Sequence, residues 1–179
     1  GPVFPTLATS FEPPAWWSDL DGDVPVVLVN QGTEATNLDD LVTPTIKGLA
    51  DQPLLVVAVP VQPGQLGDLP TNTRAEPFVP FDRLLPYVSA VVTNGGYGGT
   101  QMALAHGIPL VVAGETEDKM EVAARVEWTG AGINLRTQRT SPNEVRGAVQ
   151  ALLAEPRYRE RARKVQTDFA KYDGTARAT

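Results

Sequence analysis

Continuous apolar runs alternate along the chain with segments of mixed polarity. The runs are rich in Val and Leu and lack a polar residue at every second position, which is typical of strands buried on both faces of a sheet. They predict strands at residues 24–29, 54–59, 75–79, 87–93, 109–113 and 133–135. Because helix-like segments separate these runs, the pattern indicates βαβ units. We therefore expect an α/β fold, with a parallel sheet of about six strands and helices on both faces.

Helix signals fall between the predicted strands. Asn37 or Asp39 is expected to cap a helix that runs to about residue 51. A helical turn at 81–85, a helix at 101–106 ended by Gly107, and a helix from Thr116 or Asp118 to residue 128 should follow. The stretch Ser141-Pro142-Asn143-Glu144 joins an N-cap residue to a Pro and a Glu in the first turn, which predicts a helix start. Pro156 should then divide the remaining chain into two helices.

Residues 1–23 differ from the rest of the chain. They are rich in Pro and show no hydrophobic period, so we expect an arm or interdomain linker at 1–23 and one domain at 24–179. Trp16 and Trp17 should pack this arm onto the domain, with stacking on a ligand as the alternative. A linker at this position also suggests that another domain precedes it.

A glycine-rich stretch follows the apolar run that ends at Thr93. It reads Asn94-Gly95-Gly96-Tyr97-Gly98-Gly99-Thr100. A strand that breaks into glycines before a helix leaves backbone N–H groups free at the positive end of the helix dipole. Glycines also let a ligand approach the backbone closely. The stretch therefore favours an anion site, such as one for phosphate, over the simpler alternative of a tight turn.

Two other predicted strand ends carry polar or flexible residues. Gln31-Gly32-Thr33 follows the first strand, and residues 114–119 follow the fifth. Ligands of parallel α/β sheets bind beyond the carboxyl ends of the strands. We therefore expect these two segments to share one pocket with residues 94–100.

The composition limits the classes of partner. The chain has 179 residues with a formal net charge of −6, and 42% of its residues are hydrophobic. Nucleic acids and acidic membranes attract basic patches, so neither is an expected partner. The sequence has no Cys and no apolar run near the ~18 residues of a membrane span. It opens without a signal-like segment, and we expect a cytoplasmic protein without a membrane span.

Signals for a catalytic centre or a metal are weak. The glycine-rich stretch fits neither GxGxxG nor a Walker A loop. His106 is the only His and is expected at a helix end in a structural role, which argues against a Ser-His-Asp triad. Glu115, Glu117 and Asp118 form an acidic cluster that suits Mg²⁺. Acids at a helix N-terminus complement its dipole equally well, and we expect no metal.

Three segments together resemble the donor signature of nucleotide-sugar glycosyltransferases. They are FVPFDRLLPYVSAVVTNGGYGGT at 78–100, HGIPLVV at 106–112 and EDK at 117–119. The most similar branch is the bacterial antibiotic and macrolide enzymes, related to UDP-glucuronosyl and plant secondary-metabolite transferases. The similarity runs from about Val24 to Tyr172, and Gly1-Pro2-Val3 resembles the interdomain connection. The resemblance implies one half of a GT-B enzyme: the Rossmann-like C-terminal domain, which binds the nucleotide sugar.

The resemblance also implies roles for individual residues. Phe78 packs on the base and the backbone of Val79 pairs with its edge, while Asn94, Thr33 and the amides of 95–100 contact the diphosphate. Two residues at the start of a helix bind the sugar hydroxyls. The implied set is Thr33, Phe78, Val79, Asn94, Gly95, Gly96, Tyr97, Gly98, Gly99 and Thr100 for the nucleotide and phosphates, and Asp118 and Lys119 for the sugar.

Three positions depart from the pattern of the family. Asn94 stands where His is usual, Met102 where many relatives carry a ribose-binding Glu, and Lys119 where Gln is usual. Asn94 keeps a donor but loses a potential positive charge, and Met102 cannot accept the ribose hydrogen bonds. Lys119 adds a charge for a sugar carboxylate, for the diphosphate or for Glu115. The alternatives are that Asn94 is a turn residue, that Met102 fills the core and that Lys119 lies on a solvated helix face.

The resemblance implies an inverting glycosyltransferase that moves a sugar from UDP or dTDP to a hydroxyl of a small natural-product or lipid-like acceptor. The acceptor-activating base, usually His oriented by Asp, is expected in the absent N-terminal domain. This chain should therefore carry no catalytic residue, need no cofactor and be inactive alone. Two alternatives stay open: a nucleotide-sugar epimerase of the same architecture, and a degenerate nucleotide-binding module.

Overall fold

Six parallel strands form one sheet in the computed structural model, which describes residues 10–32 and 34–176, without the side chains of Glu117 and of 173–176. The order across the sheet is β3-β2-β1-β4-β5-β6. Every neighbouring pair is parallel. The strands are β1 Val26–Asn30, β2 Leu55–Ala58, β3 Thr73–Ala75, β4 Ala90–Thr93, β5 Leu110–Val112 and β6 Gly132–Asn134. This confirms the predicted α/β fold, and the strand order is that of a Rossmann-like sheet.

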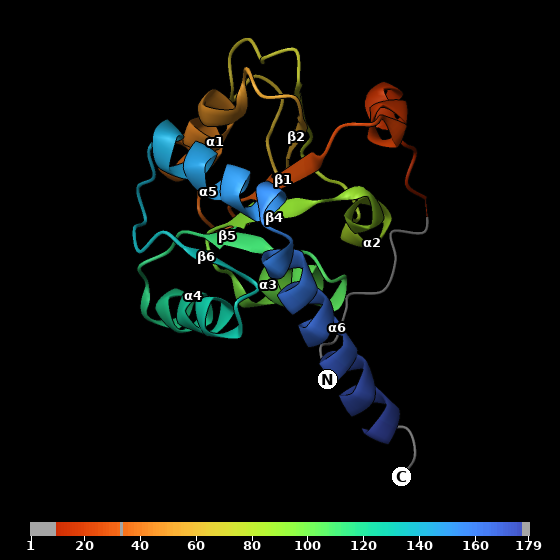
Figure 1. Cartoon of the computed structure of the whole chain (residues 1–179). Helices are drawn as coiled ribbons and strands as arrows, with labels where there is room; N and C mark the ends of the chain where they lie inside the picture. Colours follow the sequence, from red (N-terminus) through yellow and green to blue (C-terminus); the bar gives the residue numbers. More distant parts are fainter. Residues whose placement is uncertain (1–9, 33, 177–179) are drawn as a thin grey trace.

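Helices cover both faces of this sheet (Figure 1). The helices α1 Val42–Leu49 and α5 Pro142–Ala154 pack on one face. The other face carries α2 Phe81–Leu84, α3 Tyr97–Ala105, α4 Glu117–Thr129 and α6 Pro156–Ala176, with α6 extending past the rest of the fold. Short 3₁₀ helices lie at η1 Ala15–Asp21, η2 Leu38–Asp40 and η3 Leu85–Tyr87.

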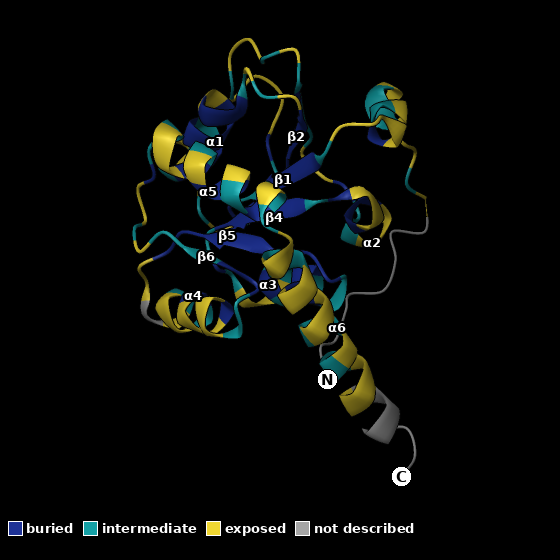
Figure 2. Cartoon of the chain, in the orientation of Figure 1, coloured by how far each residue is buried: buried dark blue, intermediate teal, exposed yellow. Residues whose placement is uncertain are grey.

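The sheet is buried between two hydrophobic cores because its side chains alternate between the faces. Val27 and Val29 of β1 point to the core under α1 and α5, whereas Leu28 points to the core under α3 and α6. All of these side chains are buried, so the strands run in dark blue through the centre of Figure 2. This double burial explains the continuous Val and Leu runs in the sequence.

The N-terminal arm packs against the face that carries α2. Trp16 and Trp17 contact the core on that side, as predicted. Trp16 Nε1 donates to Glu76 Oε1 at 2.7 Å, and Trp17 packs edge-on against Tyr87 with ring centroids 6.1 Å apart. Arg74 also pairs with Asp19 at 2.8 Å. The second half of the predicted arm therefore forms η1 on the domain surface rather than an extended linker.

Two predicted strands have other bounds in the structure. The predicted strand 75–79 is wrong in its bounds: β3 ends at Ala75, and Pro77 lacks the N–H group that a further ladder bond needs. The run 87–93 becomes a strand only at Ala90, because Leu85–Tyr87 form the 3₁₀ helix η3. In both cases a neighbouring Pro favours a turn where the hydrophobicity alone suggested an extended strand.

Helix ends follow the local signals more closely. Ser141 accepts a hydrogen bond from the Glu144 N–H, and the Glu144 carboxylate accepts from the Ser141 N–H, so the predicted capping box of α5 is confirmed. Thr116 is the N-cap of α4, but its hydroxyl bonds Asp118 at 3.2 Å rather than a backbone N–H. Asn37 caps η2 instead of α1, which begins at Val42.

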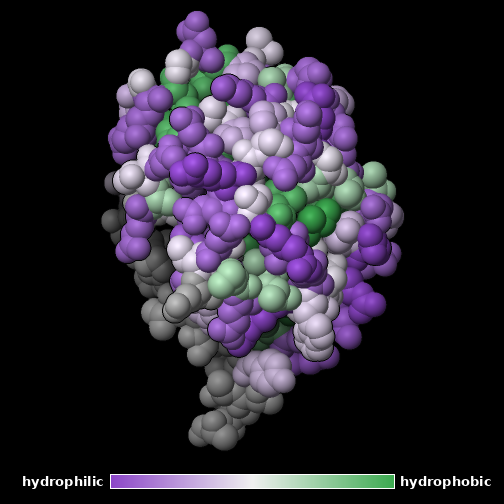
Figure 3. Space-filling model, turned by 90° about the vertical axis from the view of Figure 1, so that its left-hand side faces the viewer, coloured by the Kyte–Doolittle hydropathy of each residue, from purple (hydrophilic) through white to green (hydrophobic). Residues whose placement is uncertain are grey.

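The face of the molecule seen in Figure 3 is largely polar. Figure 3 views the molecule from the side that lies on the left in Figure 1, and hydrophobic groups appear there only in small separate patches. Among the described helices, none combines the length and apolar character that a bilayer crossing demands.

Candidate nucleotide-diphosphate site

Three chain segments meet where β1, β4 and β5 end. These strands are neighbours in the sheet, so the segments that follow Asn30, Thr93 and Val112 lie at the same edge. Their contacts are direct: a Cβ on Gly114 would lie 2.3 Å from the backbone O of Asn94 and 3.0 Å from Cβ of Lys119. The predicted convergence of the three segments is observed through contacts of Asn94 with Gln31 and Gly114 and of Gly95 with Lys119.

The side chain of Asn94 holds two of these segments together. Its Nδ2 donates to the backbone O of Gln31, and its Oδ1 accepts from the Gly96 N–H at 3.2 Å. The intervening Gly95 has φ +83°, a left-handed conformation that favours glycine. A Cβ there would also come within 3.0 Å of a Val112 methyl group. Asn94 and Gly95 thus shape the turn that leads into α3.

Helix α3 begins four residues earlier than the predicted 101–106, within the glycine-rich stretch itself. The Gly95 N–H bonds Thr93 Oγ1, the Gly96 N–H bonds Asn94 Oδ1, and the Thr100 N–H bonds the Gly96 carbonyl. Within the described part of the chain, the N–H groups of Tyr97, Gly98 and Gly99 have no hydrogen-bond partner. The expected amide cradle therefore narrows from six residues to these three.

The space in front of these amides is open. Apart from its chain neighbours and the backbone of its own helix, a Cβ on Gly98 would meet no atom of the described residues within 4 Å. On the same terms, one on Gly99 would meet only Asn30 Oδ1, at 4.0 Å. Both glycines are helical, so no unusual φ calls for glycine at either position. Their lack of side chains leaves the amides accessible to a ligand at the positive end of the helix.

Gln31 is a positioning residue that the sequence did not reveal. Its side chain is buried, donates through Nε2 to the Asn37 carbonyl, and accepts from the Val42 N–H at 3.3 Å through Oε1. It therefore caps α1 and fixes the loop that contains Thr33, which itself lies outside the described residues. No local pattern announces this role, because its partners lie up to 11 residues away.

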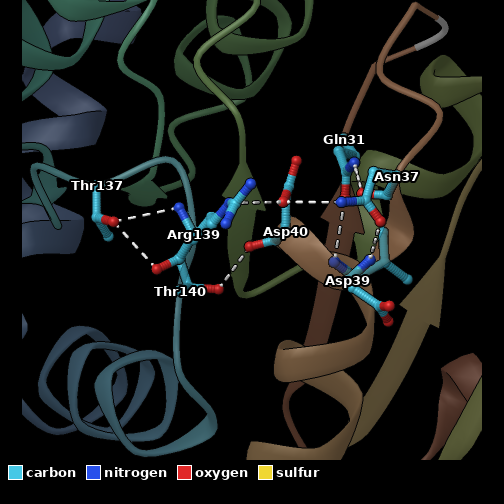
Figure 4. Close-up of polar contacts among 8 residues, drawn as sticks. Gln31, Asn37, Asp39, Asp40, Thr137, Arg139 and Thr140 are labelled. Atoms are coloured by element: carbon cyan, nitrogen blue, oxygen red, sulfur yellow. Dashed lines mark hydrogen bonds and ion pairs between the residues drawn. The ribbon is translucent and has the colours of Figure 1, made fainter.

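A second contact anchors the same loop. Figure 4 shows the segment from Gln31 to Asp40 beside the segment from Thr137 to Thr140. The Asp40 carbonyl accepts from the Thr140 N–H at 3.0 Å and from the Thr140 hydroxyl at 2.9 Å, and Arg139 pairs with the Asp40 carboxylate at 3.9 Å. The end of β6 is thereby tied to the loop after β1.

The proposed base-binding residues follow β3. Phe78 is 60% exposed, whereas Val79 beside it is buried, backbone included. The backbone groups of Val79 form no hydrogen bond with the residues that the structure describes. An exposed aromatic side chain is suited to stacking on a base, whereas the unpaired backbone groups of Val79 are buried.

Met102 and His106, both discussed in the sequence analysis, occupy positions that fit structural roles. Met102 is partly buried and packs against the core under α3, which is the core-filler alternative. His106 ends α3, and its Nδ1 lies 2.9 Å from the Met102 carbonyl, consistent with the structural role predicted for it. The hydroxyl of Thr100 is buried, and among the described side chains it is the one buried polar group without a partner.

The start of α4 completes the site. Asp118 is exposed and accepts from the Thr116 hydroxyl, and Lys119 is half-buried with its stem against the Gly95 turn. Among the described residues, no group of three acidic or His side chains forms a metal site. The side chain of Glu117, part of the predicted acidic cluster, lies outside that description.

Comparison with known proteins gives a consistent family. Residues 48–173 match the family described as "Erythromycin biosynthesis protein CIII-like, C-terminal domain". The chain is 49% identical over 178 residues to 4'-demethylrebeccamycin synthase of Lentzea aerocolonigenes, covering 99% of this chain and 42% of that protein. It is 38% identical over 174 residues to UDP-glucosyltransferase A1 of Starmerella bombicola, covering 94% of this chain and 38% of that protein.

Solved structures agree with this assignment. CalG4, the calicheamicin glycosyltransferase, has a TM-score of 0.78 at 34% identity, over 87% of this chain and 40% of CalG4. The glycosyltransferase VinC, solved in complex with dTDP, has a TM-score of 0.72 at 28% identity, over 88% of this chain and 40% of VinC. The chain spans less than half the length of each of these relatives. It belongs to the family of erythromycin biosynthesis protein CIII-like C-terminal domains, within the GT-B glycosyltransferases.

Proposed function

We propose that this chain is the donor-binding half of an inverting glycosyltransferase that uses a UDP- or dTDP-sugar. The acceptor would be a hydroxyl of a natural-product or lipid-like small molecule, bound chiefly by the N-terminal domain. The observation that carries the proposal is the row of unpaired amides at Tyr97, Gly98 and Gly99, with no side chain on either glycine. Their accessibility matches what a diphosphate requires. The VinC complex with dTDP adds support from a relative.

Each part of the site has a role in this proposal. The exposed Phe78 ring stacks on the base, and the free backbone of Val79 bonds its edge. The amides of α3 hold the diphosphate, and Asn94 fixes the turn that aims them. Thr33, outside the described residues, is the candidate hydroxyl contact. Asp118 and Lys119, in the first turn of α4, are the candidate contacts for the donor sugar.

The contribution of this domain to catalysis is electrostatic. The oxygen of the leaving diphosphate gains negative charge as the bond to the sugar breaks, and amide dipoles aimed at it stabilise that charge. The base that accepts the proton of the acceptor hydroxyl belongs to the part of the enzyme outside this chain. The chain alone is therefore expected to bind the donor without transferring its sugar.

Calorimetric titration of the chain with UDP, dTDP and ADP tests the proposal. We expect UDP or dTDP to bind with a dissociation constant at least about tenfold below that of ADP, because Phe78 and Val79 select the base. Binding should not require Mg²⁺. Absent or equally weak binding of all three nucleotides contradicts the proposal and supports the degenerate module instead.

A further inference from the structure

One cation lies among the three strand-end segments. Residues 31–33, 94–100 and 114–119 contain two Glu and one Asp, and their one basic side chain is that of Lys119. The chain as a whole carries a formal net charge of −6. An anionic ligand at this edge of the sheet therefore receives little help from the overall charge of the protein.

Lys119 is held at the centre of the site. It is the third residue of α4, and its Cβ lies 3.5 Å from the position of a Cβ on Gly95 and 3.0 Å from one on Gly114. The stem of Lys119 thus starts between the ends of β4 and β5, beside the turn that leads into the free amides of α3. Its half-buried position limits where the ammonium group can go.

The ammonium group of Lys119 has no counter-ion among the side chains that the structure describes. Within the described part of the chain, Lys119 makes no hydrogen bond or ion pair, and neither Glu115 nor Asp118 approaches its Nζ within 4 Å. Pairing with Glu115, one of the three roles open to this lysine, is therefore not observed. A cation without a partner among the described residues is available to an anionic ligand.

Asn94 does not supply this charge. Its amide is neutral, and both of its polar atoms already bond the protein, at the Gln31 carbonyl and the Gly96 N–H. The free amides of α3 contribute partial charges only. Neither Asn94 nor the α3 amides therefore supply a full positive charge to a bound diphosphate.

We propose that Lys119 pairs with the diphosphate and stabilises it as the leaving group, an inference that rests on the proposed function. In the transfer, the bond between the anomeric carbon and the β-phosphate oxygen breaks and its electron pair stays on that oxygen. The acceptor oxygen bonds the anomeric carbon, and its proton goes to the base of the other domain. The leaving nucleotide thereby gains one negative charge, which the Lys119 ammonium offsets.

The test compares Lys119→Gln with the wild-type chain and with two controls. Lys119→Arg keeps the charge, and Lys47→Gln removes an exposed lysine from α1, on the other face of the sheet. Each variant is titrated with the nucleoside diphosphate that the wild type binds, UDP or dTDP. The matching nucleoside, uridine or thymidine, is titrated in parallel, and both titrations are run at two salt concentrations. UDP-glucose and UDP-glucuronic acid form a further pair for a UDP-binding chain.

We expect Lys119→Gln to weaken nucleoside-diphosphate binding at least about tenfold and to leave nucleoside binding unchanged. The salt dependence of nucleoside-diphosphate binding should also fall. Lys119→Arg should retain most of the affinity, and Lys47→Gln all of it. A change below twofold for the nucleoside diphosphate, or a loss confined to UDP-glucuronic acid, overturns the inference. If the wild type binds no nucleotide, the proposed function fails, and the inference fails with it. Equal thermal unfolding of all variants excludes a folding defect.

Discussion

At the scale of single residues, the site depends on which backbone groups are already bonded. The family resemblance places Asn94 on a phosphate, and the structure shows its side chain joining the ends of β1 and β4. The adjacent glycines divide into two kinds. Gly95 is required by its positive φ, whereas Gly98 and Gly99 have helical backbones and open surroundings. The backbone conformation explains why Gly95 is a glycine but does not explain Gly98 and Gly99. These two glycines are therefore the stronger indication of a ligand.

Replacing Gly98 by Ala should separate stability from binding. Because Gly is a poor helix former and no protein atom lies within 4 Å of the new Cβ, we expect Gly98→Ala to raise the free energy of unfolding by about 0.5–1 kcal/mol. The same Cβ would lie in front of the free amides, so nucleotide affinity should fall at least about tenfold. Denaturant unfolding and calorimetric titration measure the two effects.

Gly147 in α5 offers the matched control for this variant. It is also helical, and a Cβ at this position would meet no protein atom within 4 Å, but it lies in the helix on the opposite face of the sheet. Gly147→Ala should raise stability similarly and leave nucleotide affinity unchanged. Unaltered nucleotide binding by Gly98→Ala would show that the ligand does not approach α3.

At the scale of elements, helix starts combine local and distant signals. The capping box of α5 is complete within four residues, so the sequence predicts it correctly. The first turn of α1 is capped by Gln31, which stands 11 positions before Val42. Helix α3 starts at Tyr97 inside the glycine-rich stretch, since glycines after a left-handed Gly95 can still form a first turn. The same stretch thus supplies both the turn and the free amides of the proposed anion site.

The capping box of α5 makes stability depend on pH. The Ser141 N–H bonds the Glu144 carboxylate and lowers the pKa of Glu144 from its ordinary value of 4.5. A lowered folded-state pKa contributes stability above the unfolded value, and that contribution is lost as the pH falls through the folded pKa. We therefore expect Glu144→Gln to be less stable than the wild type at pH 7, with the difference shrinking below about pH 4.5. Thermal unfolding across pH 3–7 measures it.

The hydroxyl half of the box provides an independent comparison. Ser141→Ala removes the acceptor for the Glu144 N–H and should cost about 0.5–2 kcal/mol at pH 7. A difference between Glu144→Gln and the wild type that stays constant from pH 7 to pH 3 would contradict a charge-dependent cap.

At the scale of the whole molecule, two cores and an arm surround one sheet. Residues 15–21 form η1 against the face that carries α2, so part of the predicted linker also completes a core. Trp17 lies at the centre of this contact, with Phe11 at 5.3 Å and Tyr87 at 6.1 Å between ring centroids. The arm therefore holds a fixed position on the domain from η1 onward.

Truncating Trp17 should destabilise the domain. Trp17→Ala removes a partly buried ring, and we expect a loss of about 2–3 kcal/mol, below the range for fully buried aromatic residues. Trp128 in α4 is 88% exposed, so Trp128→Ala should change stability by no more than about 0.5 kcal/mol. Denaturant unfolding compares the two variants. Equal stability of both would mean that the arm is only a linker.

The sequence by itself determined the layers of this protein and the place of its candidate anion site. Continuous Val and Leu runs specify strands buried on both faces, and glycines after the run that ends at Thr93 mark a helix start. These are local properties, readable from neighbouring residues. Tertiary structure alone decided that β1, β4 and β5 are adjacent, that Asn94 bonds Gln31 and that the amides of Tyr97, Gly98 and Gly99 lack partners among the described residues. Hydrogen-bond partners and strand order depend on contacts between residues distant in sequence, which no local pattern specifies.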